Sequence, residues 1–215
     1  WLTELNPYVD ATEYYAPGGG LESREITPGL TVIALDGGRL TAAYSQRTER
    51  FLAPESFLGV TLPAGLYEFG ATTLGYTSNS GRIVSGALSV SAGDFFDGDR
   101  TSITGSVSLR PNEHIVLQGS VQRNRLTLAG KPIDADLLQG RLRYGFNTRA
   151  FVSAFVQYNR VARELISNVR FNLIHAPLSD VFIVISDRRR TGMAPGERSV
   201  LDQGITIKIT RLLQF

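Results

Sequence analysis

The sequence predicts an all-β protein, and more specifically an antiparallel up-and-down transmembrane β-barrel to which this segment contributes about 12 strands. Three observations predict it. Apolar and polar residues alternate with a period of two along most of the chain. The alternating segments exceed the roughly 5–6 residues of an ordinary strand and reach the roughly 9–11 residues that cross a bilayer. The last of them, 199–215, ends on an aromatic residue.

Each expected strand has one apolar and one polar face, because successive side chains of a strand point to opposite sides. In the segment 100–110, Ile103 and Val107 share one face, and serine and threonine residues occupy the other. The segments 113–127 and 134–146 repeat the pattern, with Leu117 and Leu142 on their apolar faces. In chain order the expected strands are 2–14, 21–35, 39–52, 65–78, 82–96, 100–110, 113–127, 134–146, 149–160, 164–175, 180–188 and 199–215.

Two kinds of connection alternate between these strands. Short turns rich in Gly, Asn, Asp or Pro are expected at 36–38, 80–81, 111–113, 147–148 and 177–179. Longer and more variable connections include 53–64, 129–133 and 189–198. Outer-membrane barrels have short periplasmic turns and longer external loops. With Phe215 on the periplasmic side, the short turns all fall on that side too.

Aromatic residues near strand ends predict two girdles at the membrane–water boundaries, where amphipathic rings are favoured. The expected external girdle comprises Tyr14, Tyr15, Phe51, Tyr67, Phe69, Phe95, Phe96 and Tyr158. The expected periplasmic girdle comprises Tyr76, Tyr144, Phe146, Phe151, Phe182 and Phe215.

Composition narrows the function classes. The 215 residues suit one domain, spanning 1–215. The mean hydropathy of −0.03 is too polar for a helical membrane protein, but it suits a barrel in which only alternate residues meet lipid. The chain has no cysteine, which excludes disulfides and thiolate metal sites, and its net charge of +2 gives no case for nucleic acid. We expect no cofactor.

Several stretches together resemble one family of bacterial outer-membrane proteins, in which a carbohydrate-binding-family-9-like module precedes a C-terminal barrel of unknown function. The matching stretches are 4–10, 44–50, 93–98, 157–159, 168–174, 179–184 and 207–215. The resemblance implies a Gram-negative outer-membrane location. It also implies that this segment is the C-terminal part of a longer chain, with further strands before Trp1. The sugar-binding module is not in this segment, so no sugar function follows.

A set of basic residues has the alternation expected of the barrel interior. It comprises Arg110, Arg141, Arg143, Arg170 and Lys208. A lipid-facing charge costs roughly 2–4 kcal/mol at the midplane, which favours the inward orientation. Two interpretations follow. The residues could set the ion preference of an anion-selective path, or they could pair with carboxylates such as Glu68, Asp94, Glu164 and Asp187 in a packed interior, which is the interpretation we favour from the sequence.

Further candidate sites lie at the strand ends. Arginine forks fit phosphate, so a cluster in the last external loop is a candidate contact for lipopolysaccharide: Arg188, Arg189, Arg190 and Arg198. The terminal strand matches the signal read by the barrel-assembly machinery, through Ile207, Ile209, Leu213 and Phe215. Asp94, Asp97 and Asp99 have oxygen ligands for calcium, but such Gly-Asp stretches are more often plain turns, and we expect no metal.

Enzyme signatures are weak. The chain has only two histidines, His114 and His175, and no Gly-x-Ser-x-Gly motif. We therefore expect an integral outer-membrane protein that is not an enzyme and that either passes a solute or anchors a surface module. Its expected partners are outer-membrane lipid, lipopolysaccharide, the assembly machinery and a larger membrane complex. The alternatives are a soluble β-barrel that binds a small ligand and an outer-membrane hydrolase of the lipase type.

Overall fold

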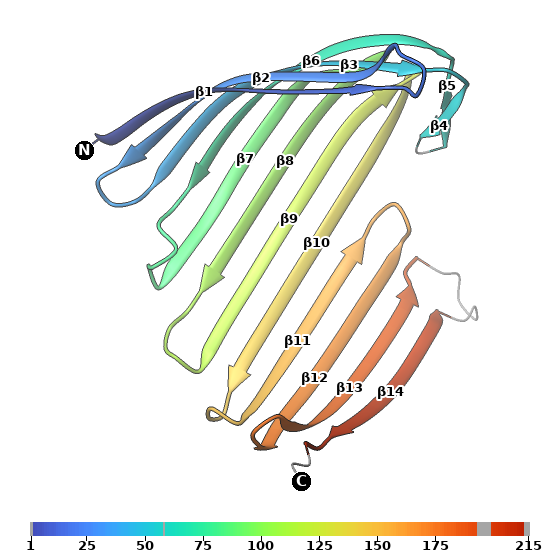
Figure 1. The fold of residues 1–215 in the computed structure, drawn as a ribbon. Helices are drawn as coiled ribbons and strands as arrows, with labels where there is room; N and C mark the ends of the chain where they lie inside the picture. Colours follow the sequence, from blue (N-terminus) through green and yellow to red (C-terminus); the bar gives the residue numbers. More distant parts are fainter. Residues whose placement is uncertain (1, 58, 193–198, 213–215) are drawn as a thin grey trace. The chain divides into compact units, whose positions relative to one another are not determined.

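The structure is a computed structural model that describes residues 2–57, 59–192 and 199–212 (Figure 1). These residues form strands and turns, and none of their segments is a helix that could cross a membrane. The long strands are β1 (Leu2–Tyr15), β2 (Leu21–Ala34), β3 (Arg39–Phe51), β6 (Gly65–Thr77), β7 (Val84–Phe95), β8 (Gly98–Leu109), β9 (Ile115–Leu128), β10 (Lys131–Gly145), β11 (Ala150–Asn159), β12 (Glu164–Ala176), β13 (Ser179–Arg190) and β14 (Val200–Thr210).

These strands make one 12-stranded sheet in the order β1-β2-β3-β6-β7-β8-β9-β10-β11-β12-β13-β14. Each long strand pairs with the long strand that follows it in sequence, which is the predicted up-and-down arrangement. The all-β class and this antiparallel sheet are confirmed. Closure is not, because β1 and β14 lie at opposite ends of the order and no pairing joins them among the described residues.

The contacts divide the chain into two compact units. Unit 1 comprises residues 1–79, 87–105 and 123–134. Unit 2 comprises residues 80–86, 106–122 and 135–215. Strands β7 to β10 contribute residues to both units, whereas β1 to β6 belong to unit 1 and β11 to β14 to unit 2.

In unit 1, the predicted segregation of side chains onto two faces is present. Leu74 lies opposite both Ala42 and Val90 in the register, and this row is exposed. On the other face, Thr73 lies opposite Ser91 and donates a 3.0 Å hydrogen bond to the Ser91 hydroxyl. We call these the apolar and polar faces of unit 1.

The expected external girdle is wrong for most of its members in unit 1, because five of the rings pack against one another. The rings of Phe51, Tyr67, Phe69, Phe95 and Phe96 have centroid separations of 4.8–5.7 Å in their contacts. We call this set the aromatic cluster. Buried aliphatic residues complete the core around it, namely Val60, Leu126 and Leu128. Burial of these rings and their mutual contacts stabilise the core of unit 1.

A short hairpin covers part of this core, inside the predicted loop 53–64. It consists of β4 (Glu55–Phe57) and β5 (Val60–Leu62). Val60 and Leu62 are buried, whereas Thr61 between them is exposed. The hairpin is therefore anchored by the apolar side of β5.

The prediction of a longer connection at 129–133 is wrong. Strand β10 begins at Lys131, so only Ala129 and Gly130 connect it to β9. Both have positive φ, 47° and 70°, as the primed two-residue hairpin turns require at their central positions. Glycine adopts this conformation without strain, and it is the residue in the sequence that could have revealed the turn.

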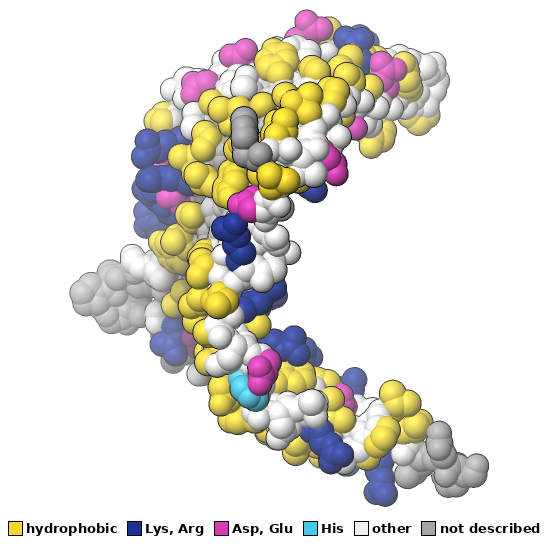
Figure 2. Space-filling view, turned by 90° about the vertical axis from the view of Figure 1, so that its left-hand side faces the viewer, with side chains coloured by type: hydrophobic (Ala, Val, Ile, Leu, Met, Phe, Trp, Pro, Cys, Tyr) yellow, Lys and Arg dark blue, Asp and Glu magenta, His cyan; other side chains and the backbone are white. Residues whose placement is uncertain are grey.

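In unit 2, the register aligns the two faces of β10 to β14 residue by residue. One row reads Leu142, Ala154, Val169, Ile185 and Ile205, and its members are each paired with the next. The neighbouring row reads Arg143, Ser153, Arg170, Val184 and Thr206. These rows define the apolar and polar faces of unit 2. Figure 2 shows hydrophobic side chains on the surface of the molecule, next to basic and polar ones.

Candidate functional site

Four of the five predicted basic residues lie together on the polar face of unit 2. Arg143 and Arg170 each lie opposite Ser153, from β10 and β12 respectively. Since neighbouring strands are roughly 4.8 Å apart, the Cα atoms of these two arginines lie roughly 10 Å apart. Arg141 precedes Arg143 by two residues on the same face of β10, and Lys208 lies opposite Phe182.

Each of the three arginines is stacked on a phenylalanine of the adjacent strand. The guanidinium carbon of Arg141 is 5.6 Å from the centre of the Phe155 ring. The corresponding distances are 5.0 Å from Arg143 to Phe151 and 4.8 Å from Arg170 to Phe182. Such contacts contribute about 0.5–1 kcal/mol at exposed sites. They restrict where each guanidinium group can point.

We call these three stacked pairs the arginine–phenylalanine ladder. The sequence analysis did not predict that its phenylalanines lie beside the arginines. Phe151 and Phe182 were expected in the periplasmic girdle, but the register places both on the polar face, where each lies beside Asn172. The parity of their positions could have revealed the face on which they lie. Phe182 falls two residues before Val184 and so shares its face, and Val184 lies in the same row as Arg143 and Arg170. Tyr144, by contrast, lies on the apolar face and packs against Phe146 at a centroid distance of 4.8 Å.

Carboxylates do not neutralise these four cations. Among the described residues, Arg141, Arg143, Arg170 and Lys208 form no ion pair. The acidic residues of the same face in β12 to β14 lie toward strand ends: Glu164, Asp180 and Asp202. The middle of the polar face therefore carries uncompensated positive charge.

Amide side chains occupy the polar face beside the arginines. The side-chain amide of Gln139 donates a 3.0 Å hydrogen bond to Oε1 of Gln157. The Ser120 hydroxyl donates one of 3.3 Å to Oε1 of Gln139. Asn172 is buried, and its Oδ1 has no hydrogen-bond partner among the described residues. This face thus offers both positive charge and polar groups that can replace water around a solute.

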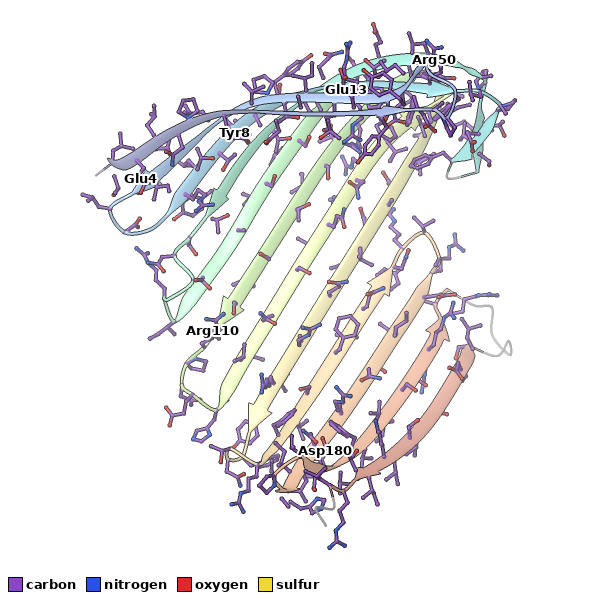
Figure 3. The ribbon with its side chains drawn as sticks, in the orientation of Figure 1. Glu4, Tyr8, Glu13, Arg50, Arg110 and Asp180 are labelled. Atoms are coloured by element: carbon purple, nitrogen blue, oxygen red, sulfur yellow. The ribbon has the colours of Figure 1, made fainter. Side chains whose placement is uncertain are left out.

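The fifth basic residue, Arg110, lies apart from this group. It follows the last residue of β8 (Figure 3). Its guanidinium donates a 3.2 Å hydrogen bond to the carbonyl of Ser80 in the connection between β6 and β7. Arg110 therefore holds a turn together and does not join the arginine–phenylalanine ladder.

The arginines expected to contact lipopolysaccharide point in different directions. Arg188 makes a bidentate contact with Glu164, with distances of 2.9 and 3.0 Å. Arg189 lies on the opposite face and contacts Asp187 at 2.6 Å. Arg190 follows at the end of β13, and Arg198 lies outside the described residues. Two of these arginines thus already have carboxylate partners.

Replacing Glu164 by glutamine is expected to lower the free energy of unfolding by no more than about 1 kcal/mol, because the Arg188 side chain is half-exposed and solvent screens the pair. A double-mutant cycle with Arg188→Gln, measured by denaturant unfolding in detergent, gives the coupling energy. Raising the salt concentration should shrink that coupling further. A coupling well above about 2 kcal/mol would contradict this view and indicate a desolvated pair.

The remaining candidates are placed as follows. Ile207 and Ile209 lie on the apolar face of β14 and are exposed, whereas Leu213 and Phe215 lie outside the described residues. Asp97 accepts hydrogen bonds from the backbone N–H of Ala129, and no group of metal-ligating side chains occurs among the described residues. His114 contacts the carbonyl of Gly145 at 2.8 Å through Nδ1.

Comparison with protein-family models, with curated proteins and with solved structures finds no match. The family resemblance of the sequence therefore stays a prediction.

Proposed function

We propose that this chain is the membrane-spanning β-sheet of a bacterial outer-membrane barrel and that its polar face lines an aqueous path for anionic solutes. One observation carries the proposal. The strands of unit 2 carry a largely exposed apolar row on one face, and exposed arginines among polar residues on the other. Closure of the sheet, either on itself or with further strands, belongs to the proposal.

The exposed apolar row is the feature that favours a membrane environment. Ile185, Ile205 and Ile207 are 45%, 70% and 63% exposed. Fully burying one such side chain is worth about 1.5–3 kcal/mol, so leaving a contiguous row of them in water is costly. Hydrocarbon removes that cost without a partner protein. A soluble ligand-binding barrel would require the opposite arrangement, with these residues facing an interior.

The polar face favours a path for anions and argues against an interior packed with ion pairs. Rings of charged side chains set the ion preference of pores. Arg141, Arg143 and Arg170 are stacked on rings instead of being paired with carboxylates, so their charge stays available to a passing anion.

Conductance in planar bilayers tests this function. The inserted chain is expected to show discrete conductance with anion preference, read from the reversal potential in a KCl gradient. The double variant Arg141→Gln, Arg143→Gln is expected to lower that preference about two-fold or more because it removes two of four unpaired charges. Arg189→Gln is the matched control, since Arg189 lies on the other face and already has a partner.

Unchanged ion preference in the double variant would contradict a role for these arginines. Absence of any conductance from protein shown to be inserted would contradict the pore. Anchoring of a surface module would then be the better account.

A further inference from the structure

Unit 1 contains a pocket that the function proposed above does not use. It has a volume of about 970 Å³, within the range of small-molecule sites. Leu62 of the hairpin and the rings of Phe51, Phe57, Phe95 and Phe96 contribute its apolar lining. Phe95 and Leu62 are buried, so they form the floor of the pocket. The strand end of β3 with Arg50, labelled in Figure 3, borders it.

The charged residues of the lining fall into two groups. Glu22, Arg50 and Glu55 are exposed, so water screens them. Arg47, Glu49 and Arg100 are half-buried. These three decide what charge a bound molecule should carry.

Only one of the three half-buried charges is paired. Arg47 forms a 2.7 Å ion pair with Glu25. Arg100 is stacked over Phe95 at 4.6 Å, and it forms no ion pair or hydrogen bond among the described residues. Glu49 likewise has no such partner there. One guanidinium and one carboxylate thus line the same aromatic pocket without contacting each other.

We propose that this pocket binds a small zwitterion with an apolar or aromatic body, of the class of an aromatic amino acid or a short peptide end. Arg100 contacts its carboxylate and Glu49 its ammonium group. The rings of Phe51, Phe57, Phe95 and Phe96 cover its apolar body. Partial burial is costly for an unpaired charge, and a ligand that carries both opposite charges relieves both residues at once. A plain anion or a plain cation would leave one of them unpaired.

The hairpin gives the site its specificity. Phe57 on β4 contacts Phe95 and Phe96 at centroid distances of 5.9 and 6.3 Å, and so closes the aromatic side of the pocket. Its own exposure leaves the ring accessible to a ligand. Strands β4 and β5 have only three residues each, so few hydrogen bonds hold the hairpin together. Its position therefore depends on the buried side chains of β5.

Three probes test the proposal on the full chain in lipid nanodiscs, with empty nanodiscs subtracted, by isothermal titration calorimetry. L-phenylalanine carries both charges, 3-phenylpropanoate lacks the ammonium group, and phenethylamine lacks the carboxylate. L-phenylalanine is expected to bind about tenfold or more tightly than either of the others, because each of them forfeits one charge-assisted contact.

Two variants assign the charges. Arg100→Gln is expected to weaken L-phenylalanine about tenfold and to leave phenethylamine unchanged. Glu49→Gln is expected to weaken L-phenylalanine by a similar factor and to leave 3-phenylpropanoate unchanged. Arg141→Gln is the matched control, because it removes an arginine that is also stacked on a phenylalanine, but in unit 2.

Several results would overturn the proposal: no saturable binding of L-phenylalanine, equal affinity for all three probes, or an equal loss in Arg141→Gln. The comparison of probes on the unaltered chain stands even if a variant fails to fold. The site is also independent of conductance, so the loss of one proposal leaves the other intact.

Discussion

Replacing Val169 by arginine is expected to reduce the free energy of folding into a bilayer by about 2–4 kcal/mol. Val169 lies near the middle of β12 on the apolar face, between Ala154 and Ile185 in the register. If that face contacts acyl chains, a guanidinium at this depth has no water and no partner. The measurement is reversible unfolding of the chain from lipid vesicles by guanidinium chloride.

The neighbouring residue supplies the matched control. Asn168 lies on the polar face, so Asn168→Arg is expected to change the same free energy by no more than about 1 kcal/mol. A protein surrounded by water would give similar costs for the two variants, because Val169 is 41% exposed and a charge there would be tolerated. Equal or reversed costs for the two variants would therefore contradict a lipid-facing row.

Replacing Phe95 by alanine is expected to destabilise unit 1 by about 3–5 kcal/mol. Phe95 is 6% exposed and contacts Phe57, Phe69 and Phe96 at centroid distances of 5.9, 5.7 and 4.8 Å. Truncation leaves a cavity among rings that cannot easily collapse into it. It also removes the ring on which Arg100 is stacked. The loss is measured as a lower midpoint of denaturant unfolding in detergent.

Phe57→Ala is the comparison for this prediction. Phe57 belongs to the hairpin and is exposed, so its truncation is expected to cost about 1 kcal/mol. Similar effects of the two substitutions would show that the aromatic cluster does not form the core of unit 1.

Alternation alone was sufficient to predict the long strands of the sheet. The period of two is physically linked to the two faces of a strand, and Leu117 and Ile207 both lie exposed on their strands. The short turns set the strand order, because an antiparallel neighbour needs only a tight connection. The predicted ends of β2 and β12 differ from the observed ones by a single residue.

The aromatic residues show why the rest was harder. A ring near a strand end is compatible with a girdle at a membrane boundary and equally with a packed core. Only the parity of its position, which fixes the face of the strand on which it lies, distinguishes the two. Phe69 and Phe95 share parity with Thr73 and Ser91 on the polar face. The hairpin inside 53–64 was not predicted, since strands of three residues are too short for their alternation to be distinguished from that of a loop.

The partners of the arginines depend on register, which the sequence does not specify without the turn conformations. Arg170 is stacked on Phe182 because the β12–β13 turn sets which residues are neighbours. Glu164 was expected among the partners of the polar-face cations, and its pairing with Arg188 is a further consequence of that register.

Spin labels on β12 distinguish apolar faces that contact lipid from apolar faces that contact water. The chain has no cysteine, so a single substitution at each of Asn168, Val169, Arg170 and Phe171 gives one label per molecule. If the apolar face contacts lipid, we expect high accessibility to oxygen at Val169 and Phe171, and high accessibility to a water-soluble nickel chelate at Asn168 and Arg170. Nickel-accessible labels at Val169 and Phe171, with oxygen favoured at the other two positions, would contradict it.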